Sequence, residues 1–136
     1  MSSIGLVSVV VEDYDVAIAW FREKLDFTLV EDTPVPEQQK RWVVMAPPAH
    51  RGEQTGARVL LARAVNEEQR SRIGNQTGGR VFLFLETDNF DRDFELYQSR
   101  GVEFVRDRKE EAYGTVAVFR DVAGNLWDLI ELRSIH

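Results

Sequence analysis

The 136-residue sequence contains no cysteine, so disulfides, thiolate metal sites and cysteine nucleophiles are all excluded. Histidine is also scarce. The two that occur are His50, in a loop that follows two prolines, and His136, the last residue. We expect both to be solvated, one in its loop and one in the tail. The sequence therefore does not favour a histidine-rich metal site or an internal histidine that acts as a general base.

Long apolar runs and an excess of basic residues are missing too. No stretch approaches the roughly 20 apolar residues that a membrane-spanning helix needs, and the first residues lack a signal-peptide pattern. The formal net charge is −6, whereas nucleic acids and anionic membranes attract clustered cations. We therefore expect a cytoplasmic protein with neither a nucleic-acid partner nor a membrane partner.

The residues that are present have the composition of one soluble globular domain, with 43% hydrophobic and 29% charged residues. Runs of β-branched and aromatic residues predict strands, and apolar residues at helical spacing predict helices. Asp13 is the expected N-cap of the first helix, and the two prolines in 33–36 should end the second strand. The predicted strands are 6–11, 27–31, 41–46, 58–62, 81–86, 102–106, 116–120 and 126–132, and the predicted helices are 13–24, 67–72 and 89–100.

The order of these elements repeats. Residues 6–15 superimpose on residues 82–91 at an offset of about 76 positions, and each half reads strand, helix and three strands. Half a domain would bury its sheet poorly alone, so we expect both modules in a single domain. Module 1 covers about 4–63 and module 2 about 80–133. The polar segment 64–79 is either a linker or, through Arg72 or Gln76, the rim of a cavity.

The last hairpin carries the strongest motif. The stretch from Phe119 to Leu132 reads FRDVAGNLWDLIEL, in which residues 121–125 form the turn because Asp, Gly and Asn favour turn geometry. The pattern FxDxxGNxxDLxE resembles the closing motif of the vicinal oxygen chelate superfamily, which includes glyoxalase I, bleomycin-resistance proteins and extradiol dioxygenases. The resemblance implies an α+β fold of two βαβββ modules that form a cupped mixed β-sheet with helices outside.

The resemblance also implies where a metal would bind. Metal-dependent members carry a Glu at the Asp128 position and a His or Gln in the first strand of each module. Those two positions hold Leu6 and Phe82 here, and the last strand of module 1 has no acidic residue. A single carboxylate is too weak to hold a dedicated Zn or Fe ion, which needs three or four protein ligands. We therefore expect no metal and no other cofactor.

Alternation along the strands predicts which side chains line the cavity, because residues two apart share a face. Asp128 interrupts an apolar face between Leu126 and Ile130, and its alternative role is a structural salt bridge with Arg41, Arg58 or Arg80. Trp42 and Tyr113 suit a cavity wall because large aromatics with a polar edge often line pockets. The predicted ligand-binding residues are Asp128, Glu86, Ser8, Trp42, Phe82 and Tyr113. The alternatives are simple packing for Ser8, a place in the core for Trp42 and Tyr113, and a solvated strand end for Glu86.

Two functions of different class fit these residues. The first is a metal-independent binding protein, similar to the bleomycin-resistance branch, that encloses an apolar or aromatic small molecule and forms a homodimer. The second is a lyase, isomerase or dioxygenase-like enzyme that uses Asp128 and Glu86 in place of a metal. A subunit with a vestigial cavity is a third alternative. Loss of the metal ligands favours the first.

Overall fold

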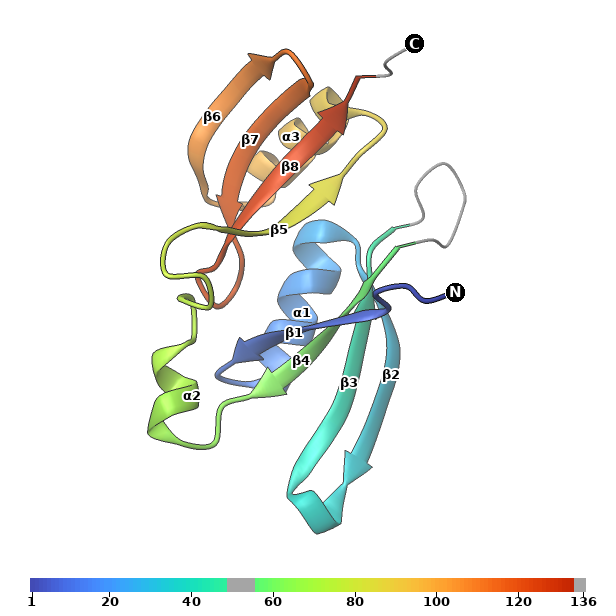
Figure 1. Cartoon of the computed structure of the whole chain (residues 1–136), viewed down its shortest axis with the longest axis vertical. Helices are drawn as coiled ribbons and strands as arrows, with labels where there is room; N and C mark the ends of the chain where they lie inside the picture. Colours follow the sequence, from blue (N-terminus) through green and yellow to red (C-terminus); the bar gives the residue numbers. More distant parts are fainter. Residues whose placement is uncertain (49–55, 134–136) are drawn as a thin grey trace. The chain divides into compact units, whose positions relative to one another are not determined.

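The computed structural model describes residues 1–48 and 56–133, and the chain divides into two compact units, Met1–Ile73 and Gly74–His136. Figure 1 shows the elements of each unit. His50 and His136 lie outside the described residues, so the expectation that they are solvated is untested. Within the described part of the chain, no helix is long and apolar enough to cross a membrane.

Unit 1 contains a four-stranded mixed sheet in the order β1-β4-β3-β2. The pair β1 and β4 is parallel, and the other two pairs are antiparallel. Its elements are β1 Leu6–Val11, α1 Tyr14–Leu25, β2 Thr28–Val35, the short 3₁₀ helix η1 Pro36–Gln38, β3 Lys40–Ala46, β4 Arg58–Arg63 and α2 Glu67–Ser71.

Unit 2 repeats this arrangement with the strand order β5-β8-β7-β6, in which β5 and β8 are parallel. The predicted α+β fold of two βαβββ modules is therefore confirmed, with a separate four-stranded sheet in each module. The elements of unit 2 are β5 Val81–Glu86, α3 Phe90–Ser99, β6 Phe104–Glu111, β7 Gly114–Arg120 and β8 Leu126–Leu132.

Local sequence signals fix the ends of both long helices. The Asp13 side chain accepts a hydrogen bond from the N–H of Val16 at 3.0 Å, which confirms it as the N-cap of α1. Asn89 caps α3 in the same way through the N–H of Arg92 at 3.1 Å. Gly101, with φ of 85°, follows α3 in the left-handed conformation that glycine adopts most easily.

The predicted bounds of strands β2 and β6 were wrong. Strand β2 continues through Pro34 to Val35, because β2 is the edge of its sheet and an edge proline need not donate to a neighbouring strand. Strand β6 begins at Phe104 rather than Val102 and extends to Glu111, since it pairs along β7 as far as Gly114. Both errors concern strand pairing, which local sequence does not encode.

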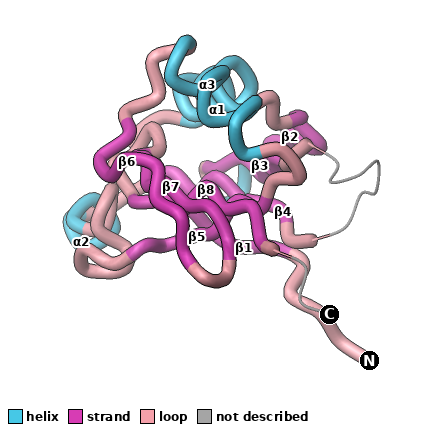
Figure 2. The backbone as a smooth tube through the Cα atoms, turned by 90° about the horizontal axis from the view of Figure 1, so that it is seen from above, coloured by secondary structure: helices cyan, strands magenta, loops and turns pink. Residues whose placement is uncertain are grey.

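One face of each sheet is covered by the helix of its own unit, as Figure 2 shows for α1 and α3. In unit 1, alternate residues of β1 and β4 and the consecutive residues 43–46 of β3 are buried, as is the apolar stripe of α1. In unit 2, rings of α3 pack edge to face against rings of the sheet, with Phe94 against Phe104 and Tyr97 against Phe119. The opposite face of each sheet is not covered by that helix, and the predicted site residues of the strands alternate onto it. The residues buried beside α1 are Val9, Val11, Val43, Met45, Val59 and Leu61.

Candidate functional site

The face of the unit 2 sheet opposite α3, here called the Asp128 face, carries one row of four paired residues. Asp128 on β8 lies between Phe84 on β5 and Val118 on β7, and Val118 pairs with Arg106 on β6. Phe84 is 63% exposed although it lies in the middle of a strand, whereas Val118 is buried. The carboxylate therefore lies among apolar side chains, beside an aromatic ring that is open to a ligand.

One oxygen of the Asp128 carboxylate, Oδ1, is buried without a hydrogen-bond donor among the described residues. Burial raises the pKa of Asp128, and the positive charge of Arg106 only partly opposes that shift. An unsatisfied buried acceptor costs about 1–3 kcal/mol, so the fold tolerates a locally unfavourable group here.

None of the three arginines that the sequence suggested as a salt-bridge partner of Asp128 forms that ion pair in the described part of the chain. Arg41 instead binds Asp32 and Asp15 in unit 1. Between residues 56 and 133, no ion pair joins Asp128 to Arg58 or Arg80, and the cation that acts on Asp128 is Arg106. Arg106 was not predicted because its place in the row depends on register shifts within β6.

The structure brings one of the other unit 2 candidates close to Asp128. Glu86 pairs with Ile130, so the two carboxylates are diagonal neighbours on adjacent strands and share the Asp128 face. Phe82 lies at a register shift in β5, between the paired residues Val81 and Leu83. Tyr113 lies in the β6–β7 turn at the far end of the sheet, 49% exposed and away from the Asp128 row.

Ser8 and Trp42 belong to unit 1 and lie on the sheet face opposite α1. Ser8 pairs with Leu60, and Trp42 pairs with Thr33 on the edge strand. Trp42 contributes to a hollow of about 360 Å³, but Ser8 does not. The hollow is lined by Val10, Tyr14, Gln38, Lys40, Arg41, Trp42, Leu60, Leu61, Ala62, Arg63, Val65 and Gln69.

The side chains at the metal positions of the family do not fit a metal. Leu6 on β1 and Phe82 on β5 have no donor atom, and β4 carries no acidic residue. Across residues 1–48 and 56–133, no three or more His, Asp or Glu side chains are grouped so that they could hold a metal ion. These positions therefore lack the three or four protein ligands that a Zn or Fe ion needs.

The turn before β8 fixes the strand that carries Asp128. Asp121 Oδ1 accepts hydrogen bonds from the N–H groups of Ala123, Gly124 and Asn125, each at 2.9 Å, and Oδ2 accepts one from Trp127 Nε1 at 2.8 Å. The backbone N–H of Gln76 donates a hydrogen bond to Asn125 Oδ1 at 3.3 Å, and Asn125 Nδ2 donates one to Gln76 Oε1 at 3.2 Å. Gln76, proposed from the sequence as a cavity-rim residue, therefore braces this turn.

Sequence comparison identifies relatives along almost the whole chain. Residues 3–129 match the Glyoxalase/Bleomycin resistance protein/Dioxygenase superfamily. A protein of Shewanella frigidimarina (strain NCIMB 400) is 55% identical over 130 residues, which cover 96% of this chain and 93% of that protein. YurT of Bacillus subtilis (strain 168) is 27% identical over 131 residues, with 94% and 98% coverage.

Solved structures agree with this assignment. UcmS2 superimposes with a TM-score of 0.79 at 27% identity, covering 96% of this chain and 98% of its own. TnmS3, an antibiotic binding protein from Streptomyces sp. CB03234, gives a TM-score of 0.74 at 28% identity, covering 98% of both chains. From its sequence match and its fold, the chain belongs to the glyoxalase/bleomycin resistance protein/dioxygenase superfamily.

Proposed function

We propose that the protein binds an aromatic small molecule on the Asp128 face without a metal. The observation that carries the proposal is the buried, unpartnered Oδ1 of Asp128 beside the exposed ring of Phe84. Binding sites commonly combine apolar walls with a few polar groups that orient the ligand. A ligand that brings a positive charge would compensate the charge of the carboxylate, and its ring would cover Phe84.

The relatives support a binding role. TnmS3 is described as an antibiotic binding protein, and this chain resembles it over 98% of its length. We extend that role to this chain as part of the proposal, with a cationic aromatic compound as the ligand class. The ligand is proposed to be a cation because a positive charge attracts the Asp128 carboxylate more strongly than a neutral ring does.

The proposal is tested with 10-methylacridinium, a tricyclic cation whose charge does not change with pH near neutrality, and with neutral 10-methylacridone as its control. Fluorescence titration should show at least tenfold tighter binding of the cation, because the carboxylate attracts its fixed charge, and two unit charges about 4 Å apart attract by about 1–4 kcal/mol between water and a protein surface. Addition of EDTA should leave the affinity unchanged. Equal binding of both compounds, or loss of binding in EDTA, would contradict the proposal.

The proposal includes a homodimer in the cytoplasm. Edge strands such as β2 and β6 are exposed to pairing unless they are shielded, and a two-fold dimer is the commonest oligomer of soluble proteins. We expect the dimer mass in sedimentation equilibrium at micromolar concentration. A single species at the monomer mass would show that this part of the proposal is wrong.

The second candidate function is an enzyme of the lyase, isomerase or dioxygenase-like kind. It is favoured by two carboxyl groups on the same face, Asp128, whose pKa burial raises, and Glu86 on the neighbouring strand, because two carboxyl groups can divide the roles of general acid and general base. Turnover of a candidate substrate by the wild-type protein that is abolished in Glu86→Gln would favour the enzyme over the binding protein.

A further inference from the structure

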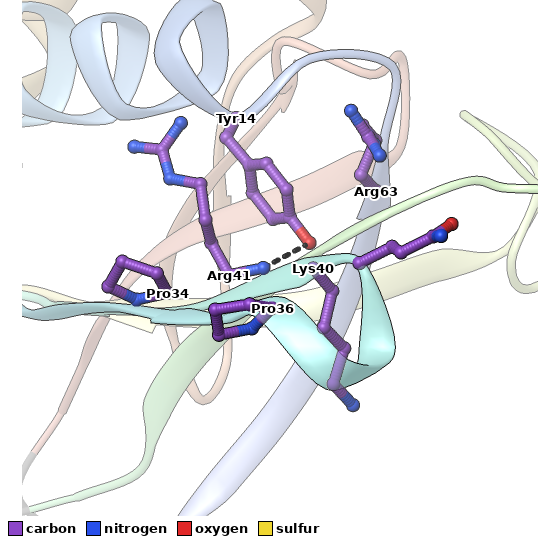
Figure 3. A pocket seen from close by; sticks show the side chains of 7 residues that line it. Tyr14, Pro34, Pro36, Lys40, Arg41 and Arg63 are labelled. Atoms are coloured by element: carbon purple, nitrogen blue, oxygen red, sulfur yellow. Dashed lines mark hydrogen bonds between the residues drawn. The ribbon is translucent and has the colours of Figure 1, made fainter.

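Beside the hollow that contains Trp42, unit 1 has a second hollow around the ring of Tyr14. Its volume is about 350 Å³, and it lies where β2, η1 and β3 meet the end of β4. Figure 3 shows the Tyr14 ring with the arginines Arg41 and Arg63 on either side of it. The lining residues are Tyr14, Pro34, Pro36, Gln39, Lys40, Arg41 and Arg63.

One of the two arginines is already neutralised. The guanidinium of Arg41 donates two hydrogen bonds to the carboxylate of Asp32, at 2.7 and 3.1 Å, and one to Asp15 at 3.0 Å. These contacts raise the pKa of Arg41, and the hydrogen bond from Arg41 lowers the pKa of Asp32. Arg41 therefore stays a fixed part of the wall, with two carboxylates beside it.

The other cations of the hollow remain free for a ligand. Within residues 1–48 and 56–133, neither Arg63 nor Lys40 forms an ion pair, and Arg63 lies 5.6 Å from the centre of the Tyr14 ring. The Tyr14 hydroxyl accepts a hydrogen bond from the backbone N–H of Arg41 at 3.3 Å. Its own proton has no acceptor in the described part of the chain. A guanidinium and a hydroxyl donor thus lie together, with Lys40 at the rim.

An apolar surface adjoins these donors. The hollow that contains Trp42 shares Tyr14, Lys40, Arg41 and Arg63 with the hollow around Tyr14. Val65, 59% exposed, lines the hollow that contains Trp42. Its N–H donates a hydrogen bond to the Gln69 side chain at 2.9 Å. The apolar side chains in this wall are Val10, Trp42, Leu60, Leu61, Ala62 and Val65.

We infer that this joint hollow binds a small aromatic carboxylate. The carboxylate would accept hydrogen bonds from Arg63 and the Tyr14 hydroxyl, and its ring would lie against Trp42. A basic site in a chain of net charge −6 is a local feature that the overall composition conceals. The site lies wholly in unit 1, so it does not depend on the function proposed for the Asp128 face of unit 2.

The probe pair is 1-naphthaleneacetate and 1-naphthaleneacetamide, which differ only in the charged group. We expect the carboxylate to bind at least tenfold more tightly than the amide in calorimetric titration. Arg63→Gln should weaken carboxylate binding about tenfold or more and leave amide binding within twofold. Arg58→Gln is the matched control, because it removes the same charge from the other end of β4 and Arg58 lines neither hollow. It should leave both affinities within twofold.

The location is checked by ¹H–¹⁵N spectra, in which the indole peak of Trp42 is assigned by its disappearance in Trp42→Phe. That peak should shift on addition of 1-naphthaleneacetate to the wild-type protein. Equal affinity for the two probes, no effect of Arg63→Gln, an unmoved Trp42 peak or no binding at millimolar probe would each overturn the inference. None of these results bears on 10-methylacridinium binding at Asp128, so the two proposals fail separately.

Discussion

Asp128→Asn should weaken the binding of 10-methylacridinium about 10- to 150-fold while the protein stays at least as stable as the wild type. A loss of this size lies within the attraction between the carboxylate and the fixed charge of the dye, about 1–4 kcal/mol for unit charges about 4 Å apart. Stability should not fall, because the carboxylate forms no ion pair in the described part of unit 2 and its Oδ1 has no hydrogen-bond donor there. Fluorescence titration and urea denaturation of both proteins measure the two effects.

The pH dependence of stability has a definite sign. Burial raises the pKa of Asp128 in the folded protein above its value in the unfolded chain, so the folded state binds this proton more tightly. The contribution of Asp128 to stability therefore falls as pH rises from the unfolded pKa through the folded pKa. The amide that Asp128→Asn introduces cannot titrate, so the variant's advantage should be absent below the unfolded pKa and largest at neutral pH.

The control variant is Asp91→Asn, which removes the same charge from the first turn of α3, on the other side of the sheet. It should bind 10-methylacridinium within twofold of the wild-type protein. If Asp128→Asn instead lost about 3–5 kcal/mol of stability with unchanged dye binding, Asp128 would be half of a structural ion pair. The proposed binding site would then be wrong.

The sequence predicted the features that depend on near neighbours along the chain. The helix cap at Asp13 and the turn at Asp121 follow from side chains that bind backbone groups two or three residues away. Strand alternation also predicted that Asp128 shares a face with Leu126 and Ile130, because side chains two residues apart on one strand point to the same side. These features could be read without knowing how the strands pair.

The hollow around Tyr14 could not be predicted in the same way. Its donors come from the start of α1 and the ends of β3 and β4, which only strand pairing brings together. Tyr14 looks like an ordinary first residue of a helix, and Arg63 like a solvated strand end.

The need for glycine at position 114 is likewise a tertiary effect, because a Cβ there would come within 2.2 Å of the carbonyl oxygen of Glu131 on β8.

The largest effect on stability is expected for Asp121→Ala, which should lower the free energy of unfolding by about 3–4 kcal/mol. The variant leaves the N–H groups of Ala123 and Asn125 and the buried Trp127 indole N–H without an acceptor, whereas the Gly124 N–H keeps the carbonyl oxygen of residue 121. Hydrogen bonds to charged groups are each worth about 1.5–3 kcal/mol but do not add fully. Asp121→Asn should lose less, since its amide oxygen can still accept from the backbone while its NH₂ group faces the indole.

Urea denaturation followed by circular dichroism measures these losses, with Asp107→Ala as the control for removal of an acidic side chain. Asp107 is exposed on β6, and its side chain accepts from the adjacent Arg108 N–H, so the change should be within about 0.5 kcal/mol. If Asp121→Ala lost as little as Asp107→Ala, the four hydrogen bonds would not stabilise the β7–β8 turn. The position of Asp128 on β8 would then have to be fixed by its strand pairing alone.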